Sequence, residues 1–236
     1  MEPTDKANEL STSILKIIHQ VNELFEEQAF EVERLDATIK IMTHEFIATS
    51  YLAEIFAKIR QQAPLVKFDV QTYNEHCYEL LSDGKIDLVI AAGLNASKQF
   101  STELFRTERL MCLVDQHHPA INDWSIEQVF SFDHIKFKQL EEKYDPVSGF
   151  AKRSDRFTRN IGMLTDSLDV QPSLLVHSKL IAFLPESLAN QGATNFKLKI
   201  LPCPFELPQL SINSIWHSSK TDNTKHTWLR GFFNET

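Results

Sequence analysis

The sequence contains no long apolar run and no layout of a targeting segment. None of its 236 residues lies in an apolar stretch near the roughly 20 residues that a membrane-spanning helix requires. The first residues lack the basic and then apolar order of a signal peptide. We therefore expect a cytoplasmic protein that has no membrane partner.

Basic charge is scarce as well. The 24 Lys and Arg residues are outnumbered by 32 Asp and Glu residues, which gives a net charge of −8. DNA binding needs clusters of Lys and Arg that neutralise phosphates. We do not expect this chain to bind duplex DNA by itself. Its length and its hydrophobic content of 42% suit one large or two small globular domains.

Motifs of common catalytic sites are also missing. The six glycines are scattered and form neither a GxGxxG pattern nor a phosphate-binding loop. No HExxH motif or Cys/His quartet suggests zinc, and no GxSxG turn presents a nucleophile. His117 and His118 are adjacent, so on a strand they would point to opposite faces. We expect no metal, no cofactor and no enzymatic activity.

The three cysteines, Cys77, Cys112 and Cys203, lie far apart in the sequence and have no CxxC spacing. Buried, reduced thiols are the simplest interpretation. A redox-active pair is the alternative.

A heptad pattern marks residues 5–29. Apolar residues recur there at spacings of four, three, four and three, which predicts a helix with one apolar seam. The seam comprises Leu10, Ile14, Ile17, Val21 and Leu24. Two heptads are fewer than a coiled coil normally needs. Pairing with a second chain and packing on the helix's own domain therefore remain alternatives.

From residue 35 onward, segments typical of strands and helices alternate, as in parallel sheets with right-handed crossovers. The first unit has a strand at Ile39 and Ile41, a helix with Leu52, Ile55, Phe56 and Ile59 on its buried face, a strand at 66–70, a helix at 74–81 and a strand at 86–92. The second unit has strands at 110–114, 134–137, 160–164, 180–184 and 198–201, and helices at 125–130, within 148–158, at 167–177 and at 185–190. A strand at 211–216 and a helix at 222–233 follow.

Short motifs occur along the chain in a recognisable order. Residues 103–119 combine an acidic-polar lead, an apolar strand and a terminal His-Pro. The others are residues 43–46 (THEF), 80–88 (LLSDGKIDL), 181–189 (IAFLPESLA), 214–217 (SIWH) and 227–230 (TWLR). Each motif is weak alone, but the ordered set resembles the LysR-type transcriptional regulators over essentially the whole chain.

The resemblance implies an α/β protein with two Rossmann-like subdomains of the periplasmic-binding-protein type II fold. Two crossover strands would join them, and a long N-terminal linker helix would precede them. We expect a linker and dimerisation helix at 1–34 and an effector-binding domain at 35–236. Subdomain I would comprise 35–108 and 209–236, and subdomain II 109–208.

By the same resemblance, the chain is the ligand-sensing and oligomerisation region of a bacterial regulator. A small-molecule effector would bind between the lobes and control transcription. DNA would be bound only through a winged helix-turn-helix that this chain does not contain. We expect a homodimer or tetramer in which residues 47–60 meet 167–178 of the partner. A solute-binding protein of the same fold, or a headless paralogue acting through mixed dimers, is the alternative.

The effector site is expected where strands end. Ligands of open parallel sheets bind at the carboxyl ends of strands, and two facing units leave a cleft. The candidate residues are Thr43, His44, Glu45, Gly93, Lys138, Gln139, Thr165, Asp166, Ser167, Trp216 and His217. Helix capping or fold support is the alternative role for each. Glu45 and Asp166 would oppose an anionic effector unless they turn away.

Histidines also bear on the expected site. His44, His177 and His217 are expected near the same region. Because histidine ordinarily titrates near neutral pH, they predict an effector affinity that varies between pH 5 and 8.

Overall fold

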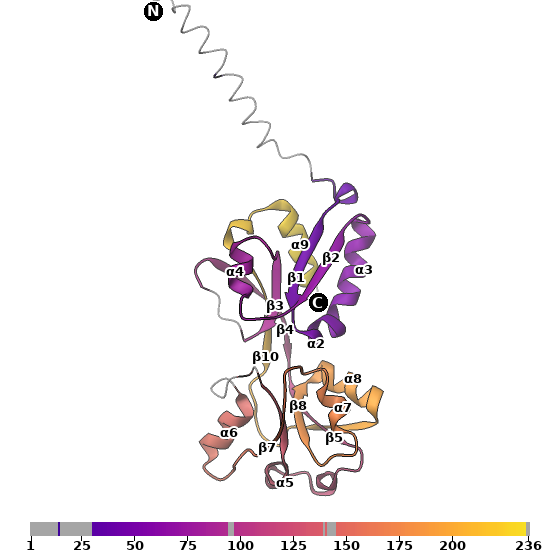
Figure 1. Cartoon of the computed structure of the whole chain (residues 1–236), viewed down its shortest axis with the longest axis vertical. Coiled ribbons are helices and arrows are strands. Elements are labelled where there is room, and N and C mark those ends of the chain that lie inside the picture. The colour runs from indigo at the N-terminus through magenta and orange to yellow at the C-terminus, as the bar shows by residue number, and fades with distance from the viewer. Residues whose placement is uncertain (1–13, 15–29, 94–96, 139, 141–144, 235–236) are drawn as a thin grey trace, which may run out of the picture.

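The computed structural model describes residues 14, 30–93, 97–138, 140 and 145–234, which form two α/β lobes stacked along the long axis (Figure 1). Each lobe is built on a five-stranded sheet. The largest core cluster contains buried residues from both lobes, among them Ile39 and Ile90 of the first and Leu113 and Leu184 of the second. The α/β fold with two sheets that the sequence predicts is confirmed.

Lobe I is the upper lobe of Figure 1 and has the strand order β2-β1-β3-β10-β4. β1, β2 and β3 are parallel, whereas β10 runs antiparallel to its neighbours β3 and β4. The strands are β1 (Thr38–Thr43), β2 (Lys67–Thr72), β3 (Leu88–Ala92), β4 (Phe100–Glu108) and β10 (Leu210–His217). The helices are α2 (Glu45–Ile47), a π-helical turn η2 (Ala48–Leu52), α3 (Ala53–Gln62), α4 (Cys77–Ser82) and α9 (Thr224–Asn234), with 3-10 turns at Val32–Arg34 and Ser218–Lys220.

Lobe II has the strand order β7-β6-β8-β5-β9. β6 is parallel to β7 and β8, and β5 is antiparallel to β8 and β9. The strands are β5 (Leu110–Asp115), β6 (His134–Phe137), β7 (Ile161–Thr165), β8 (Ile181–Pro185) and β9 (Leu198–Pro202). The helices are α5 (Ile126–Ser131), α6 (Pro146–Ser154), α7 (Gln171–Leu175) and α8 (Glu186–Phe196), with a 3-10 turn at Pro119–Asp123.

The chain crosses between the lobes twice. At the first crossing the chain passes from lobe I to lobe II at Arg109, because β4 belongs to the sheet of lobe I and β5 to the sheet of lobe II. The second crossing is the segment 203–209 between β9 and β10. The predicted apolar strand at 86–92 corresponds to β3, in which Leu88, Val89 and Ile90 are fully buried. Such a continuous apolar run is typical of a strand covered on both faces.

Two helices differ from the sequence-based prediction. The helix expected at 167–177 is confined to Gln171–Leu175, because Val176 leaves the helical region and His177 has a φ of 58°. The helix expected at 185–190 continues to Phe196 and includes Gly192. Glycine is a weak helix former, but here it permits close packing against Pro172 of α7.

The predicted linker helix and its seam lie outside the described residues except for Ile14, which is helical and 52% exposed. No helix of the described part of the chain is both long and apolar enough to cross a membrane.

All three cysteines are free thiols, but two of them are neighbours in space. Cys112 of β5 and Cys203 after β9 belong to one core cluster and share a hydrogen bond. Burial raises the pKa of Cys112, whereas the hydrogen bond with Cys112 lowers the pKa of Cys203. The large separation in sequence therefore does not keep these thiols apart.

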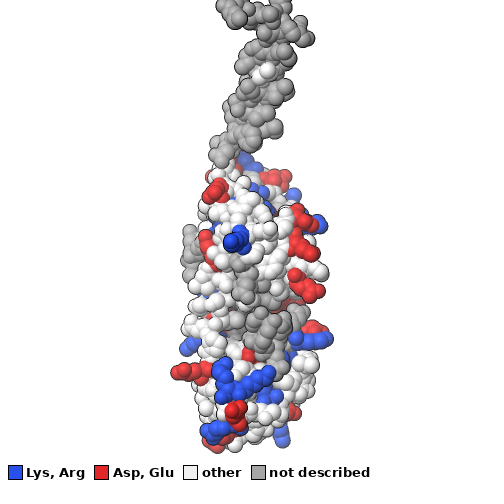
Figure 2. Space-filling view, turned by 90° about the vertical axis from the view of Figure 1, so that its left-hand side faces the viewer, with Lys and Arg blue, Asp and Glu red and all other residues white. Residues whose placement is uncertain are grey.

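Surface charge is unevenly distributed. Figure 2 shows Lys and Arg side chains gathered on the face of lobe II that α6 covers. The last turn of α6 carries Lys152 and Arg153, where positive charge interacts favourably with the helix dipole.

Two helical glycines allow the packing of α8 to be tested. A Cβ atom at Gly192 would lie 2.8 Å from Pro172 Cβ and 3.0 Å from Leu113 Cδ2, whereas one at Gly231 in α9 would meet nothing within 4 Å. We expect Gly192→Ala to lower the free energy of unfolding by about 1–3 kcal/mol through overpacking. Gly231→Ala should leave it unchanged or raise it by up to about 1 kcal/mol. Urea unfolding monitored by circular dichroism measures both, and equal effects would contradict the packing.

Candidate functional site

A cavity of about 680 Å³ lies between the lobes. In lobe I, residues that follow β1 and β3 line the cavity. In lobe II, the lining comes from β6, β8 and the starts of α6 and α7, and the second crossing closes one side. The lining includes His44, Phe46, Tyr73 and Gly93 of lobe I, Lys136, Phe137, Asp145, Arg159, Gln171 and Phe183 of lobe II, and Pro208, Gln209 and Asn213 of the crossing and β10. Its walls are largely aromatic and aliphatic, with a few polar groups, as in small-molecule sites.

Several residues predicted from strand ends meet at this cleft. His44 and Gly93 line the cavity itself. Glu45, Asp166 and Ser167 line a smaller hollow of about 40 Å³ that shares His44. The Ser167 hydroxyl donates a hydrogen bond to Glu45 Oε2 across the lobes at 2.6 Å. The two carboxylates are therefore absent from the lining of the large cavity.

Other predicted residues are close to the cleft but support the fold. The Thr43 hydroxyl is buried and donates to the Ile90 carbonyl at 2.7 Å, which ties β1 to β3. The Thr165 hydroxyl is buried and accepts from Gln171 Nε2 at 2.9 Å, so that Gln171 rather than Thr165 lines the cavity. Lys138 Nζ is paired with Asp166 at 3.6 Å on the surface. Gln139 lies outside the described residues.

Trp216 and His217 occupy the opposite edge of the sheet, which corrects their expected position. β10 is antiparallel to β3, and Ile212 pairs with Ala92 while Ile215 pairs with Val89. The carboxyl end of β10 is consequently at the far edge from the carboxyl end of β3. Trp216 is buried and bonded through its indole N–H to Thr221, and neither residue lines the cavity.

His44 is the histidine in the cavity wall. Burial lowers its pKa to about 4, although the neighbouring Glu45 carboxylate acts in the opposite direction. His177 and His217 do not line the cavity. The imidazole of His44 is therefore mainly neutral between pH 5 and 8. The expected variation of effector affinity over this range stays a prediction.

A buried charged cluster in lobe II was missed by sequence reasoning. Asp145 caps the N-terminus of α6, accepting hydrogen bonds from Val147 N at 3.1 Å and Ser148 N at 3.3 Å. It also forms an ion pair with Arg159, and Lys136 Nζ lies 3.9 Å from Asp145 Oδ2. The Asp-Pro pair opening a helix could have signalled the cap. Nothing in the sequence pattern indicates that Arg159 meets it.

The geometry of the two lobes corresponds to a known family. Residues 33–236 match the model of the LysR substrate binding domain. This chain belongs to the LysR family. It is the ligand-sensing region of a LysR-type transcriptional regulator, as its motifs predict.

Individual relatives support this assignment. Nodulation protein D of Azorhizobium caulinodans is 21% identical to this LysR domain, over 97% of the chain and 74% of that protein. The HTH-type transcriptional activator NagR of a Ralstonia species is 25% identical, over 100% of the chain and 79% of that protein. The regulatory domain of CrgA from Neisseria meningitidis is 15% identical and has a TM-score of 0.70, covering 85% of this chain and 98% of that one. The shared fold is of the periplasmic-binding-protein type II class.

In this LysR domain a buried carboxylate joins the lobes beside the cleft. Glu108, at the end of β4, is 7% exposed. It accepts hydrogen bonds from the Tyr51 hydroxyl of lobe I at 2.6 Å and from the Ser187 backbone N–H of lobe II at 2.9 Å. Gln191 of α8 also donates to Ser50 at 2.9 Å, on the side where α2 stands above α8 in Figure 1.

The neutral state of His44 predicts a pH dependence of stability. Its pKa is about 4 in the folded chain and 6.5 in a model peptide. The contribution of neutral His44 to the free energy of unfolding is fully present above pH 6.5 and is lost as the pH falls toward 4. The reason is that His44 in the unfolded state binds a proton that the folded state excludes. At pH 5 the loss is about 2 kcal/mol. Urea unfolding at pH 7 and pH 5 should show that His44→Phe reduces the difference by about this amount; an unchanged difference would contradict a buried neutral His44.

Proposed function

We propose that a small-molecule effector binds in the cavity between the lobes and thereby changes the action of the regulator on DNA. The observation that carries this is a cavity of about 680 Å³ whose walls come from both lobes and from the second crossing. A ligand there would contact both lobes at once. It can shift their relation only through its differential affinity for the alternative arrangements.

The binding residues we propose differ in part from those suggested by the sequence. His44, Tyr73, Gly93 and Gln171 supply polar groups or close backbone approach. Thr43 and Thr165 act as positioning residues through their hydrogen bonds to Ile90 and Gln171. We propose that Glu45 and Ser167 hold the lobes together through their hydrogen bond and do not contact the ligand.

The domain division supports the same mechanism. We propose that lobe I comprises 35–108 and 209–236 and lobe II 109–208. In the described part of the chain, Arg109 and the segment 203–209 connect the two sheets. We infer that these two crossings act as the hinge. The described residues of the site offer binding groups and no activated nucleophile. We therefore propose recognition without catalysis, in the cytoplasm where a transcription factor meets DNA.

A bulky side chain introduced on one wall of the cavity tests whether ligands bind there. Asn213 of β10 lines the cavity, and Asn195 of α8 is exposed elsewhere. N-phenyl-1-naphthylamine is a neutral dye that fluoresces in apolar surroundings. We expect it to bind the wild type and Asn195→Trp equally, and to bind Asn213→Trp at least about tenfold more weakly because the indole fills the site. Fluorescence titration measures this. Equal binding to all three proteins would contradict the cavity as a ligand site.

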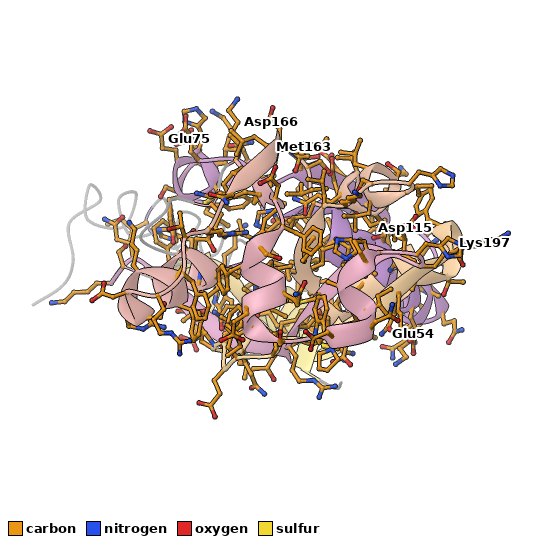
Figure 3. The ribbon with its side chains drawn as sticks, turned by 90° about the horizontal axis from the view of Figure 1, so that it is seen from below. Glu54, Glu75, Asp115, Met163, Asp166 and Lys197 are labelled. Carbon is orange, nitrogen blue, oxygen red and sulfur yellow. The ribbon has the colours of Figure 1, made fainter. Side chains whose placement is uncertain are left out.

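We also propose that the chain forms homo-oligomers through the edge that β7 and α7 present. Leu164 is 58% exposed on edge strand β7, and Val170 and Leu174 on the following segment are 45% and 37% exposed. Figure 3 shows Met163 of β7 and Asp166 just beyond it together at one border of the molecule. An apolar edge strand is a ready surface for a second chain. Residues 47–60 of the partner and the seam at residues 10–24 are the proposed further contacts.

Sedimentation velocity at micromolar concentration tests this surface. We expect the wild type to be a dimer or larger. The double variant Leu164→Asp, Leu174→Asp should shift toward monomer, because buried carboxylates destabilise an apolar contact. Leu104→Asp is the control, since Leu104 is 56% exposed on β4, an edge strand of the lobe I sheet. A monomeric wild type, or equal behaviour of both variants, would contradict the proposed interface.

A further inference from the structure

The carboxylate in the effector cavity is already saturated by donors of lobe II. Asp145 is 2% exposed and pairs with Arg159 Nη1. Its oxygens also accept from Val147 N, from Ser148 N and from the Ser148 hydroxyl at 3.0 Å. A carboxylate offers about four acceptor sites, so little capacity remains for a ligand. Because Asp145 also caps α6, that helix N-terminus needs no further anion.

The cations of the same wall keep donors without acceptors. Arg159 is 7% exposed, and its Nε donates to His134 Nδ1 at 3.2 Å. Its Nη2 has no hydrogen-bond acceptor among the described residues. Lys136 is 17% exposed and its Nζ is 3.9 Å from Asp145 Oδ2, too far for a hydrogen bond. Both donor groups belong to residues of the cavity wall.

The other titratable residues of the wall are neutral near pH 7. Burial lowers the pKa of His44 to about 4 and raises that of Tyr73 to about 12. His134, which accepts the bond from Arg159, is likewise kept neutral because burial lowers its pKa to about 4. Lys136 and Arg159 then face one negative group, Asp145. Among the described residues of the wall, the positive charges therefore exceed the negative charges by one, and charge interactions beside low-dielectric walls are stronger than in bulk water.

We propose that the effector is an amphipathic monoanion, with one anionic group bound by Lys136 Nζ and Arg159 Nη2 and an apolar body against the aromatic wall. This rests on the proposed function of the cavity. Phe137 and Phe183 supply that wall, and the Arg159 guanidinium lies 5.6 Å from the Phe183 ring centre. A cation would meet the excess positive charge, and a neutral apolar molecule would leave two donors unpaired. The charged end of the ligand is thus placed in lobe II, away from Glu45 and Asp166.

Two dyes that differ in one charged group test this selectivity. 8-Anilinonaphthalene-1-sulfonate has the aromatic groups of N-phenyl-1-naphthylamine plus one sulfonate. We expect the wild type to bind the anionic dye at least about tenfold more tightly than the neutral dye. Lys136→Met should remove most of that preference without weakening the neutral dye, and Lys136→Arg should keep it. Lys199→Met is the matched control, because Lys199 is exposed on β9 outside the cavity.

The outcomes separate the two proposals. If Asn213→Trp excludes the neutral dye but the wild type shows no preference for the anion, the monoanion inference fails while the cavity stands. The inference also fails if Lys136→Met and Lys199→Met lose the preference equally, or if neither loses it. If Asn213→Trp affects neither dye, the cavity itself is not the site and both proposals fall.

Discussion

The chain must pass between two sheets twice, and the rest of the molecule depends on how that double crossing is held. Glu108 lies at the first crossing with 7% of its surface exposed. A carboxylate at such depth is stable only when it is hydrogen-bonded. Its partners are Tyr51 of lobe I and Ser187 of lobe II. The carboxylate therefore links the two lobes by hydrogen bonds at the first crossing.

The chemistry of the cavity follows from a second buried group, Asp145. It is used completely inside lobe II, by the start of α6 and by Arg159. The charged groups of this cluster that remain for the cavity are cationic: the Lys136 ammonium and the Arg159 guanidinium nitrogen that has no acceptor in the described part of the chain. Lobe I contributes the neutral His44 and aromatic surface. Lobe II thus offers both charge and, through Phe137 and Phe183, aromatic surface, and lobe I adds neutral and aromatic side chains on the other side of the cavity.

Much of the fold follows from local patterns. The strand predicted at 134–137 is β6, and the helix with a buried face at Ile55 and Ile59 is α3. These predictions succeed because periodicity records which side of an element is buried. Gly192 shows where local propensity and packing differ: glycine weakens a helix, but α8 continues through it to Phe196, and close packing against Pro172 requires a glycine there. The helix α7 is shorter than predicted because His177 has a positive φ, which ends the helical conformation.

The sequence by itself determined the alternating elements, the family and the strand ends where His44 and Gly93 meet the cavity. Only the tertiary structure decided the direction of β10, which places Trp216 and His217 away from the cavity. It also decided the meeting of Lys136, Asp145 and Arg159, and the contact of Cys112 with Cys203. Local periodicity encodes burial, whereas strand direction and the pairing of distant side chains arise from non-local hydrogen bonding and packing.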